Sequence, residues 1–225
     1  MGARIEVSRD SQIAVVLIDD HDLFRSGLAV LLQREPDIEI VGQASQGKKG
    51  VRLTLELRPQ VVLMDLEMPD LDGISATREI LAQDPQIRVL ALSAVSEDGY
   101  VEAAVLAGAC GFLLKDSPIA DVAAAVRAAS MGESWLAPRA ATAVLESLRR
   151  GHIEPSSSPS PGDVLSAREL EVLQLVARGL DNSQIASELC ISPSTAKNHI
   201  SNVLTKLGIS NRVQAAIYAV RHGLG

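Results

Sequence analysis

Four short apolar runs in this sequence each end at a polar residue whose side chain could take part in phosphoryl chemistry. The runs cover residues 13–18, 61–64, 88–92 and 111–114. The polar residues that follow them are Asp19 with Asp20, Asp65, Ser93 and Lys115. If the runs are parallel strands, their carboxyl ends share one edge of a sheet, and these side chains converge there. Three carboxylates, a hydroxyl and an ammonium can bind a divalent cation and accept a phosphoryl group.

The elements that must position these residues alternate between strand-like and helical patterns across a domain predicted at 13–130. The predicted strands are 13–18, 38–42, 61–64, 87–92 and 110–114. The predicted helices are 22–34, 47–57, 73–83, 97–107 and 118–129, the last with Ser117 as N-cap. Five βα repeats predict an α/β domain of the flavodoxin type, in which helices cover both faces of a doubly wound, five-stranded parallel sheet.

The three carboxylates predict a magnesium site. Adjacent carboxylates repel one another unless a cation is present. Mg²⁺ prefers hard oxygen ligands and bridges readily to phosphate. Asp20 would ligate the ion directly and Asp19 through water, whereas Asp65 would be both ligand and nucleophile. Lys115 would pair with a phosphoryl oxygen, and Ser93 would hydrogen-bond to another. A lone Asp pair is more often a helix cap, so the prediction depends on all five residues together.

Residues 13–129 resemble the receiver domain of two-component response regulators. The resemblance implies phosphorylation of Asp65 by a sensor histidine kinase, with the main-chain carbonyl of Glu67 as a further metal ligand. It also implies that Phe112, three positions before Lys115, is the aromatic switch residue. Tyr is the commoner residue there, so any rearrangement of Phe112 depends on packing alone.

Residues 131–162 are expected to form a linker, with a helix at about 138–150 and a flexible stretch, rich in Pro, Ser and Gly, at 151–162. A second, all-α domain is expected at 163–225. Its four helices are predicted at 167–177, 183–189, 193–207 and 211–221, the first opened by a Ser166–Glu169 capping box. The short connection between the middle two is typical of a helix-turn-helix.

The predicted helix at 193–207 has one apolar and one polar face. Ala196, Ile200 and Val203 share the stripe expected to pack into the domain core. The opposite side carries short polar and basic residues and no Glu, which suits insertion into a DNA groove. The predicted DNA-contacting residues are Ser194, Thr195, Lys197, Asn198, Ser201 and Asn202. An ordinary solvated helix face remains the alternative.

The stretch STAKNHISNVLTKLGISNR, within residues 164–223, resembles the recognition helix and following turn of LuxR-type DNA-binding domains. With the receiver, the whole chain is similar to a NarL/FixJ-type response regulator. That resemblance implies a transcription factor that binds promoter DNA as a homodimer. The residues it implies for the dimer contact are Val213, Ala216, Ile217 and Val220.

Composition is compatible with this interpretation. The formal charge is −7, but no acidic residue follows Glu188, so the C-terminal end of the chain is basic. This basic end suggests one localised anionic partner. Cys110 and Cys190 have no metal-site or disulfide-framework spacing, which favours the reducing cytosol. No apolar run approaches the roughly 18 residues of a membrane span. We therefore expect a cytoplasmic protein without membrane attachment.

Two other functions fit parts of the sequence. An aspartyl-phosphate phosphatase would use similar residues, but it usually carries its nucleophile in a DxD arrangement on the first strand, where this chain has Asp19-Asp20. Such an enzyme would turn over small phosphoesters. A constitutive regulator, whose receiver only dimerises, would bind DNA equally with and without acetyl phosphate. We expect a non-enzymatic regulator switched by phosphorylation.

Overall fold

The computed structural model describes residues 12–94, 98–136 and 161–224. The helix predicted at about 138–150 and nearly all of the flexible stretch predicted at 151–162 lie outside these residues. None of the described helices is both long and apolar enough to cross a bilayer.

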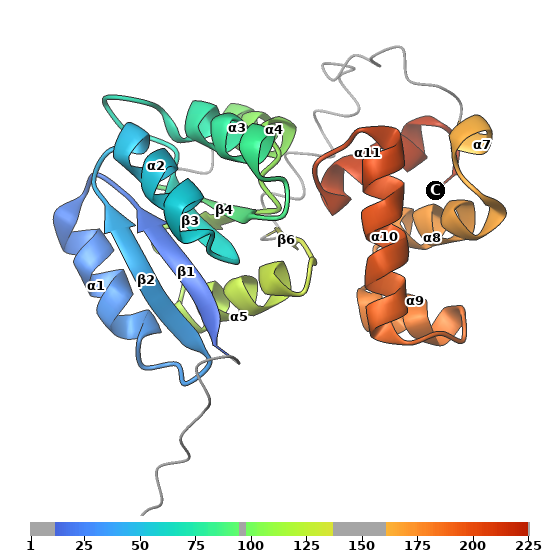
Figure 1. Cartoon of the computed structure of the whole chain (residues 1–225), viewed down its shortest axis with the longest axis horizontal. Helices are drawn as coiled ribbons and strands as arrows, with labels where there is room; N and C mark the ends of the chain where they lie inside the picture. The colour runs from blue at the N-terminus through green and yellow to red at the C-terminus, as the bar shows by residue number, and fades with distance from the viewer. Residues whose placement is uncertain (1–11, 95–97, 137–160, 225) are drawn as a thin grey trace, which may run out of the picture.

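A parallel sheet forms the centre of the N-terminal domain (Figure 1). Its strand order is β2-β1-β3-β4-β5-β6, so the chain winds outward in both directions from β1, as the sequence predicts for a doubly wound fold. The strands are β1 (Ile13–Ile18), β2 (Ile38–Ala44), β3 (Val61–Asp65), β4 (Arg88–Ser93), β5 (Gly111–Leu114) and β6 (Trp135–Leu136).

Helices cover both faces of the sheet. The alternation of side chains along β1 shows why: Val15 and Leu17 point to one core, whereas Val16 and Ile18 point to another. The first core is closed by α1 (Asp22–Leu32) and α5 (Ile119–Ser130). The opposite face is covered by α2 (Gly47–Leu57), α3 (Gly73–Gln83) and α4 (Asp98–Ala107). Burial on both faces explains the continuous apolar runs of the strands.

The structure differs from prediction in two details near the end of this domain. The two-residue strand β6 pairs with Gly111 and Phe112 of β5, although it lies within the linker predicted at 131–162. Ser117 does not cap α5: the N-cap is Pro118, which makes no side-chain cap hydrogen bond. The Ser117 amide instead donates to the Leu114 carbonyl at 3.0 Å, which closes a turn directly after β5.

The C-terminal domain contains the four predicted helices and one more short helix among the described residues. They are α7 (Pro161–Val164), α8 (Ala167–Ala177), α9 (Asn182–Glu188), α10 (Pro193–Leu207) and α11 (Arg212–Arg221). Ser166 and Glu169 form the predicted capping box. Ser192 caps α10, with Pro193 in its first turn, and Gly208 ends the helix in the left-handed conformation at φ +64°.

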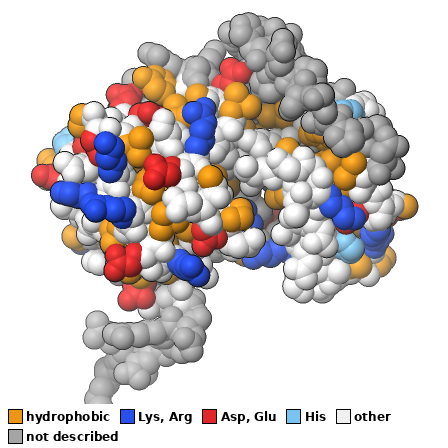
Figure 2. All heavy atoms as spheres, turned by 45° about the horizontal axis from the view of Figure 1, so that its top comes forward, with side chains coloured by type: hydrophobic (Ala, Val, Ile, Leu, Met, Phe, Trp, Pro, Cys, Tyr) orange, Lys and Arg blue, Asp and Glu red, His pale blue; other side chains and the backbone are white. Residues whose placement is uncertain are grey.

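The two domains lie against each other. In Figure 1, α11 lies beside α4, and α10 runs past the edge of the N-terminal domain near β6. Figure 2 shows acidic and basic side chains interspersed on the visible face of the N-terminal domain. The visible face of the C-terminal domain is mostly uncharged.

Candidate functional site

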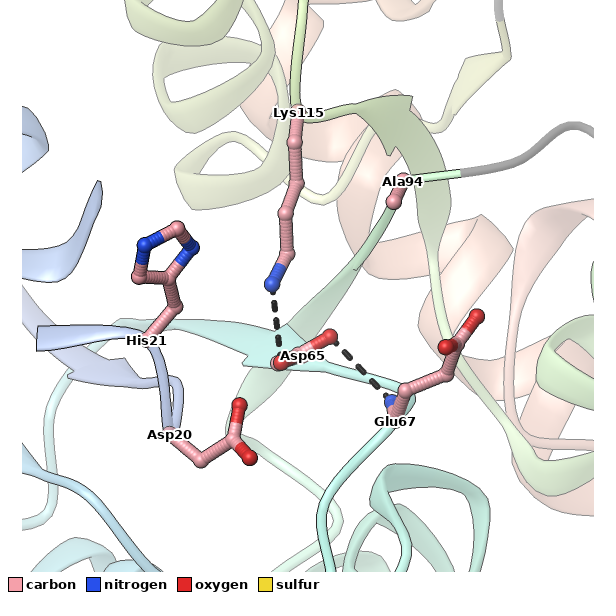
Figure 3. A pocket seen from close by; sticks show the side chains of 6 residues that line it. All are labelled: Asp20, His21, Asp65, Glu67, Ala94 and Lys115. Carbon is pink, nitrogen blue, oxygen red and sulfur yellow. Dashed lines mark hydrogen bonds and ion pairs between the residues drawn. The ribbon is translucent and has the colours of Figure 1, made fainter. Parts of the chain in front are cut away.

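The residues predicted to converge do so at the carboxyl edge of the sheet. Asp19 and Asp20 follow β1, and Asp65 is the last residue of β3. One carboxylate oxygen from each of these three residues lies within 4.8 Å of the others. Figure 3 shows Asp20 and Asp65 lining one side of a pocket, with Lys115 above them. The fold therefore assembles an acidic cluster from residues far apart in the chain.

Lys115 is the cation of this cluster. Its ammonium lies 2.8 Å from Asp19 Oδ2 and 2.8 Å from Asp65 Oδ2, and 5.2 Å from the ring centre of Phe24. Burial lowers the pKa of Lys115, but its contacts with the two carboxylates outweigh burial and raise that pKa above its usual value. The side chain therefore stays a fixed positive charge beside Asp65.

Asp65 is almost fully buried, with 1% of its side chain exposed. Its Oδ1 accepts a hydrogen bond from the Glu67 amide at 3.2 Å. Burial raises the pKa of Asp65, the Lys115 hydrogen bond partly offsets this, and the negative charge of Asp19 raises it further. A second positive charge in the pocket would relieve both unfavourable effects.

The donor set fits a hard divalent cation. Asp19 Oδ2 is buried and lacks a hydrogen-bond partner among the described residues, although it forms an ion pair with Lys115. Asp20 is exposed and opens onto a pocket of about 410 Å³. The pocket is lined by Asp20, His21, Asp65, Glu67, Ala94 and Lys115. Hard carboxylate oxygens gathered beside an open pocket are consistent with a metal site.

Local contacts hold Asp19 and the start of α1 in place. The Asp19 side chain accepts from the His21 amide at 2.8 Å, and Arg25 Nη1 donates to the Asp19 carbonyl at 2.6 Å. Asp19 thus also stabilises the turn before α1, but the Asp pair is not the helix cap of the simpler interpretation, because the N-cap of α1 is His21 and no side chain caps the helix. That role leaves Oδ2 of Asp19 directed to the cluster.

The loop after Asp65 is fixed from both ends. The Asp70 carboxylate accepts from the amides of Gly47 and Lys48 at 2.8 and 3.1 Å, which ties the loop to the start of α2. Gly73 begins α3 so close to β3 that a Cβ there would lie 1.9 Å from the Asp65 carbonyl oxygen. Glycine is therefore required for the return of the chain beneath Asp65.

The other predicted receiver residues lie around this centre. Ser93 is completely buried at the end of β4, and Phe112 is 1% exposed within β5. Glu67 is exposed at the pocket rim. Two lining residues are missing from the prediction, His21 and Ala94. Each directly follows a predicted site residue, and this adjacency is the only signal in the sequence that could have identified them.

On α10, the structure separates the apolar and polar faces as predicted. Ala196, Ile200 and Val203 are buried in the domain core. Ser194, Lys197, Asn198 and Asn202 are exposed, whereas Thr195 and Ser201 are half-buried. The predicted DNA-contacting set therefore lies on one side of one helix, and Lys197 of this set also donates to the Ser130 carbonyl of the N-terminal domain at 3.4 Å.

The four residues predicted for the dimer contact are in different environments. Val220 is 52% exposed, and Ala216 is partly buried against the core of its own domain. Val213 and Ile217 are 8% and 7% exposed because they pack against the N-terminal domain. Two of the four residues predicted for the dimer contact are thus buried by the N-terminal domain.

Comparison with known proteins gives the class for each half of the chain. Residues 15–127 match the response regulator receiver domain, and residues 163–219 match the bacterial regulatory proteins of the luxR family. The chain belongs to the two-component response regulators that join a receiver domain to a LuxR-type DNA-binding domain. It acts as a transcriptional regulator and is not an enzyme.

Relatives match over nearly the whole chain. The transcriptional regulatory protein LiaR of Bacillus subtilis is 45% identical over 94% of this chain and 99% of its own length. The response regulator VraR of Staphylococcus aureus is 40% identical over 94% of this chain and 98% of its own length.

The solved structure of RcsB dimers bound to DNA has the same fold. Its TM-score is 0.55 at 23% identity, and the match covers 94% of this chain and 98% of that one. The RcsB protein in that structure is a dimer bound to DNA. A receiver domain implies a kinase partner.

Proposed function

We propose that this protein is switched by Mg²⁺-dependent phosphorylation of Asp65 by a sensor histidine kinase, and that phosphorylation controls promoter binding through α10. One observation carries the proposal. One oxygen from each of three carboxylates lies within 4.8 Å of the others, the Lys115 ammonium pairs with two of these carboxylates, and Asp65 ends a buried strand beside an open pocket. This is the arrangement required to accept a phosphoryl group.

Asp19, Asp20, Asp65 and the main-chain carbonyl of Glu67 would hold Mg²⁺. When bound, the ion neutralises carboxylate charge and allows an anionic phosphate to approach. Asp65 would attack phosphorus through a carboxylate oxygen, and the phosphodonor would leave with the electrons of the broken bond. Lys115 would pair with a phosphoryl oxygen, and the hydroxyl of Ser93 would hydrogen-bond to another.

The polar side of α10 would enter the major groove. Lys197 can reach guanine or phosphate, and Asn198 can form two hydrogen bonds with adenine. Ser194 and Thr195, in the first turn, suit contacts to phosphate. Ser201 and Asn202 extend the same face by one turn. Two copies would bind together on DNA, with α11 contributing the contact between them.

This proposal divides the chain into a receiver at 13–130, a linker at 131–162 whose residues Trp135–Leu136 add strand β6 to the receiver sheet, and a DNA-binding domain at 163–225. The family matches at 15–127 and 163–219 support the division. A cytoplasmic location follows from a kinase-controlled regulator that acts on DNA. The free thiols of Cys110 and Cys190 are compatible with it.

Mass spectrometry after incubation with Mg²⁺ and acetyl phosphate tests the site. We expect one label, on Asp65, that is absent in Asp65→Asn and absent when Mg²⁺ is removed. Asp72→Asn is the matched control, because Asp72 caps α3 through Ser75 and Asn caps a helix equally well. A label on another residue, or one that survives in Asp65→Asn, would contradict the proposal.

DNA binding is tested by selecting duplexes from random sequence with the phosphorylated protein. Affinity for the selected duplex should rise on treatment with acetyl phosphate and stay low in Asp65→Asn. Equal affinity with and without phosphorylation would indicate the constitutive regulator instead.

A further inference from the structure

A small pocket lies where α10 passes the N-terminal domain (Figure 1), at the edge of the sheet opposite to the acidic cluster. Its charged lining residues are Arg88, the first residue of β4, and Lys197 of α10. Arg88 lies about 16 Å from Ser93, since a strand rises about 3.3 Å per residue and Ser93 ends β4 at the acidic cluster. The pocket is therefore separate from the proposed phosphorylation site.

Two positive side chains, one from each domain, come close together at Gly132. A Cβ on Gly132 would lie 3.5 Å from Lys197 Cε and 3.8 Å from Arg88 Nη2, so these two atoms are at most about 7 Å apart. Like charges at this separation repel one another, and the repulsion is stronger away from bulk water. An anion between them would turn this repulsion into two attractions.

No acidic residue is found among the described residues that line the pocket. In the described part of the chain, the Arg88 side chain forms no hydrogen bond and no ion pair. Lys197 donates to the Ser130 carbonyl at 3.4 Å, which is a neutral partner. Glu133 accepts from the Asn182 amide at 3.4 Å and is not one of the lining residues. The positive charge of the pocket is therefore not balanced by its own described residues.

The side chains around the pocket offer more hydrogen-bond donors than acceptors. The guanidinium of Arg88 has five N–H donors in a planar fork, and the ammonium of Lys197 has three. Asn198 and Ser201 of α10 add an amide and a hydroxyl group. An oxyanion has only acceptor atoms and forms its strongest hydrogen bonds with charged donors of this kind. The chemistry of the pocket thus matches an oxyanion.

The size of the pocket limits the occupant to a small ion. Its volume is about 130 Å³, room for about four water molecules, whereas pockets for drug-sized ligands measure about 300–1,000 Å³. A tetrahedral oxyanion fits this space, and a nucleotide does not. Ile200, which is buried, and Leu204, which is half-buried, also line the pocket. These apolar walls lower the local dielectric constant and strengthen the attraction between an anion and the two cations.

We propose that this pocket binds one small tetrahedral oxyanion of the phosphate class between Arg88 of the N-terminal domain and Lys197 of the C-terminal domain. The planar fork of Arg88 would contact two oxygens of the ion, and Lys197 would contact a third as a point charge. The site goes beyond the proposed function and does not depend on it, since it requires neither phosphorylation of Asp65 nor DNA.

The experiment titrates inorganic phosphate into the full chain without Mg²⁺, with chloride adjusted to keep the ionic strength constant. Calorimetry gives the affinity and the stoichiometry, and the amide resonances of Gly132 and Lys197 give the location. We expect one phosphate per chain, and we expect sulfate to compete with it. Arg88→Gln and Lys197→Gln should each weaken phosphate binding about tenfold or more, because each removes charged hydrogen-bond donors.

Arg78→Gln is the matched control. Arg78 is exposed on α3, and its side chain has no partner among the residues that the structure describes. This variant should bind phosphate as the parent chain does. Arg88→Lys keeps the charge but loses the planar fork, so its affinity should lie between those of the parent and Arg88→Gln. If Arg88→Gln fails to fold, Lys197→Gln, at an exposed position, decides by itself.

The site is rejected if phosphate binds no more tightly than chloride, or if Arg88→Gln and Lys197→Gln bind phosphate as Arg78→Gln does. Asp65→Asn distinguishes this pocket from the acidic cluster. Phosphate binding that is retained in Asp65→Asn and lost in Arg88→Gln supports the pocket. The reverse result would place the ion at Asp65 and overturn the inference.

Discussion

The ammonium of Lys115 lies 2.8 Å from Oδ2 of Asp65, a residue 50 positions earlier in the chain. The same ammonium lies 2.8 Å from Asp19, so one cation balances two buried carboxylates. The net charge of these three groups remains negative. This remaining negative charge is consistent with a metal site.

Lys115→Met should destabilise the receiver by about 2 kcal/mol in the absence of Mg²⁺. Breaking a buried ion pair leaves uncompensated charge, and the partial exposure of Lys115 reduces the cost. Added Mg²⁺ should stabilise the variant more than the parent, because the ion replaces the missing charge. Urea unfolding with and without Mg²⁺ measures both effects. Lys49→Met, at an exposed position of α2, should be neutral; equal loss in both variants would argue against a special role for Lys115.

Asp65→Asn should stabilise the metal-free protein at neutral pH. Burial first, and the charge of Asp19 second, raise the pKa of Asp65 above its usual 3.8 despite Lys115. A carboxyl with a raised pKa favours folding when protonated, and this stability is lost as pH rises through the folded-state pKa. The advantage of the variant should therefore shrink as pH falls toward 3.8 and vanish below it. Unfolding free energies across this range would contradict the argument if the advantage grew in acid.

Glu169→Gln should cost the C-terminal domain about 1 kcal/mol at pH 7, a value reduced for the exposure of Lys206. The Lys206 hydrogen bond, followed by those from Ser166, lowers the pKa of Glu169 from 4.5 to about 2. A lowered pKa contributes stability above pH 4.5 that is lost as pH falls to about 2. The cost should therefore disappear in acid. Denaturant unfolding at several pH values measures it.

The control for Glu169 is Glu171→Gln. Glu171 pairs only with Arg168 among the described residues, and its side chain is 53% exposed. Exposed pairs of this kind contribute little, so its effect should stay near zero at every pH. A pH-dependent loss as large as that of Glu169→Gln would mean that burial and capping do not strengthen the Glu169 pair.

Asn198→Ala and Lys197→Ala should weaken DNA binding in different ways. Loss of a bidentate base contact should cost about 1–3 kcal/mol and relax the preference for one base. Loss of a phosphate contact should weaken all sequences alike and reduce the salt slope by about 1. Binding titrations against the selected duplex and its point variants, at several salt concentrations, separate the two. Arg178→Ala, at the exposed end of α8, is the charge-matched control for Lys197.

The receiver fold could be predicted from the sequence because each strand is buried on both faces and bounded by turn residues. The strand ends alone predict which side chains meet, since parallel strands align their carboxyl ends. Three of the five residues predicted in this way, Asp20, Asp65 and Lys115, line the pocket. Ser192, Asp72 and Gly108 mark helix ends through capping and left-handed conformations, which are local effects.

Features that depend on tertiary contacts were not predictable in this way. The strand β6 has two residues, which is too few for a periodic pattern. It forms because its backbone pairs with Gly111 at the edge of β5. Ser117 has the sequence of a cap, but its amide is used in a turn. Val213 and Ile217 are recognisable as an apolar face of α11, yet no pattern tells whether a receiver or a second copy covers it.

The single tryptophan of the chain, Trp135, lies in β6 and packs in part against the core beneath α5. Its strand partner is Gly111, where a Cβ would lie 2.5 Å from the Trp135 carbonyl oxygen, and the next pair in the ladder joins Leu136 to Phe112. Intrinsic tryptophan fluorescence therefore originates at one known place, the edge of the receiver next to the predicted switch residue. The molecule carries its own optical reporter for that edge, and no dye needs to be attached.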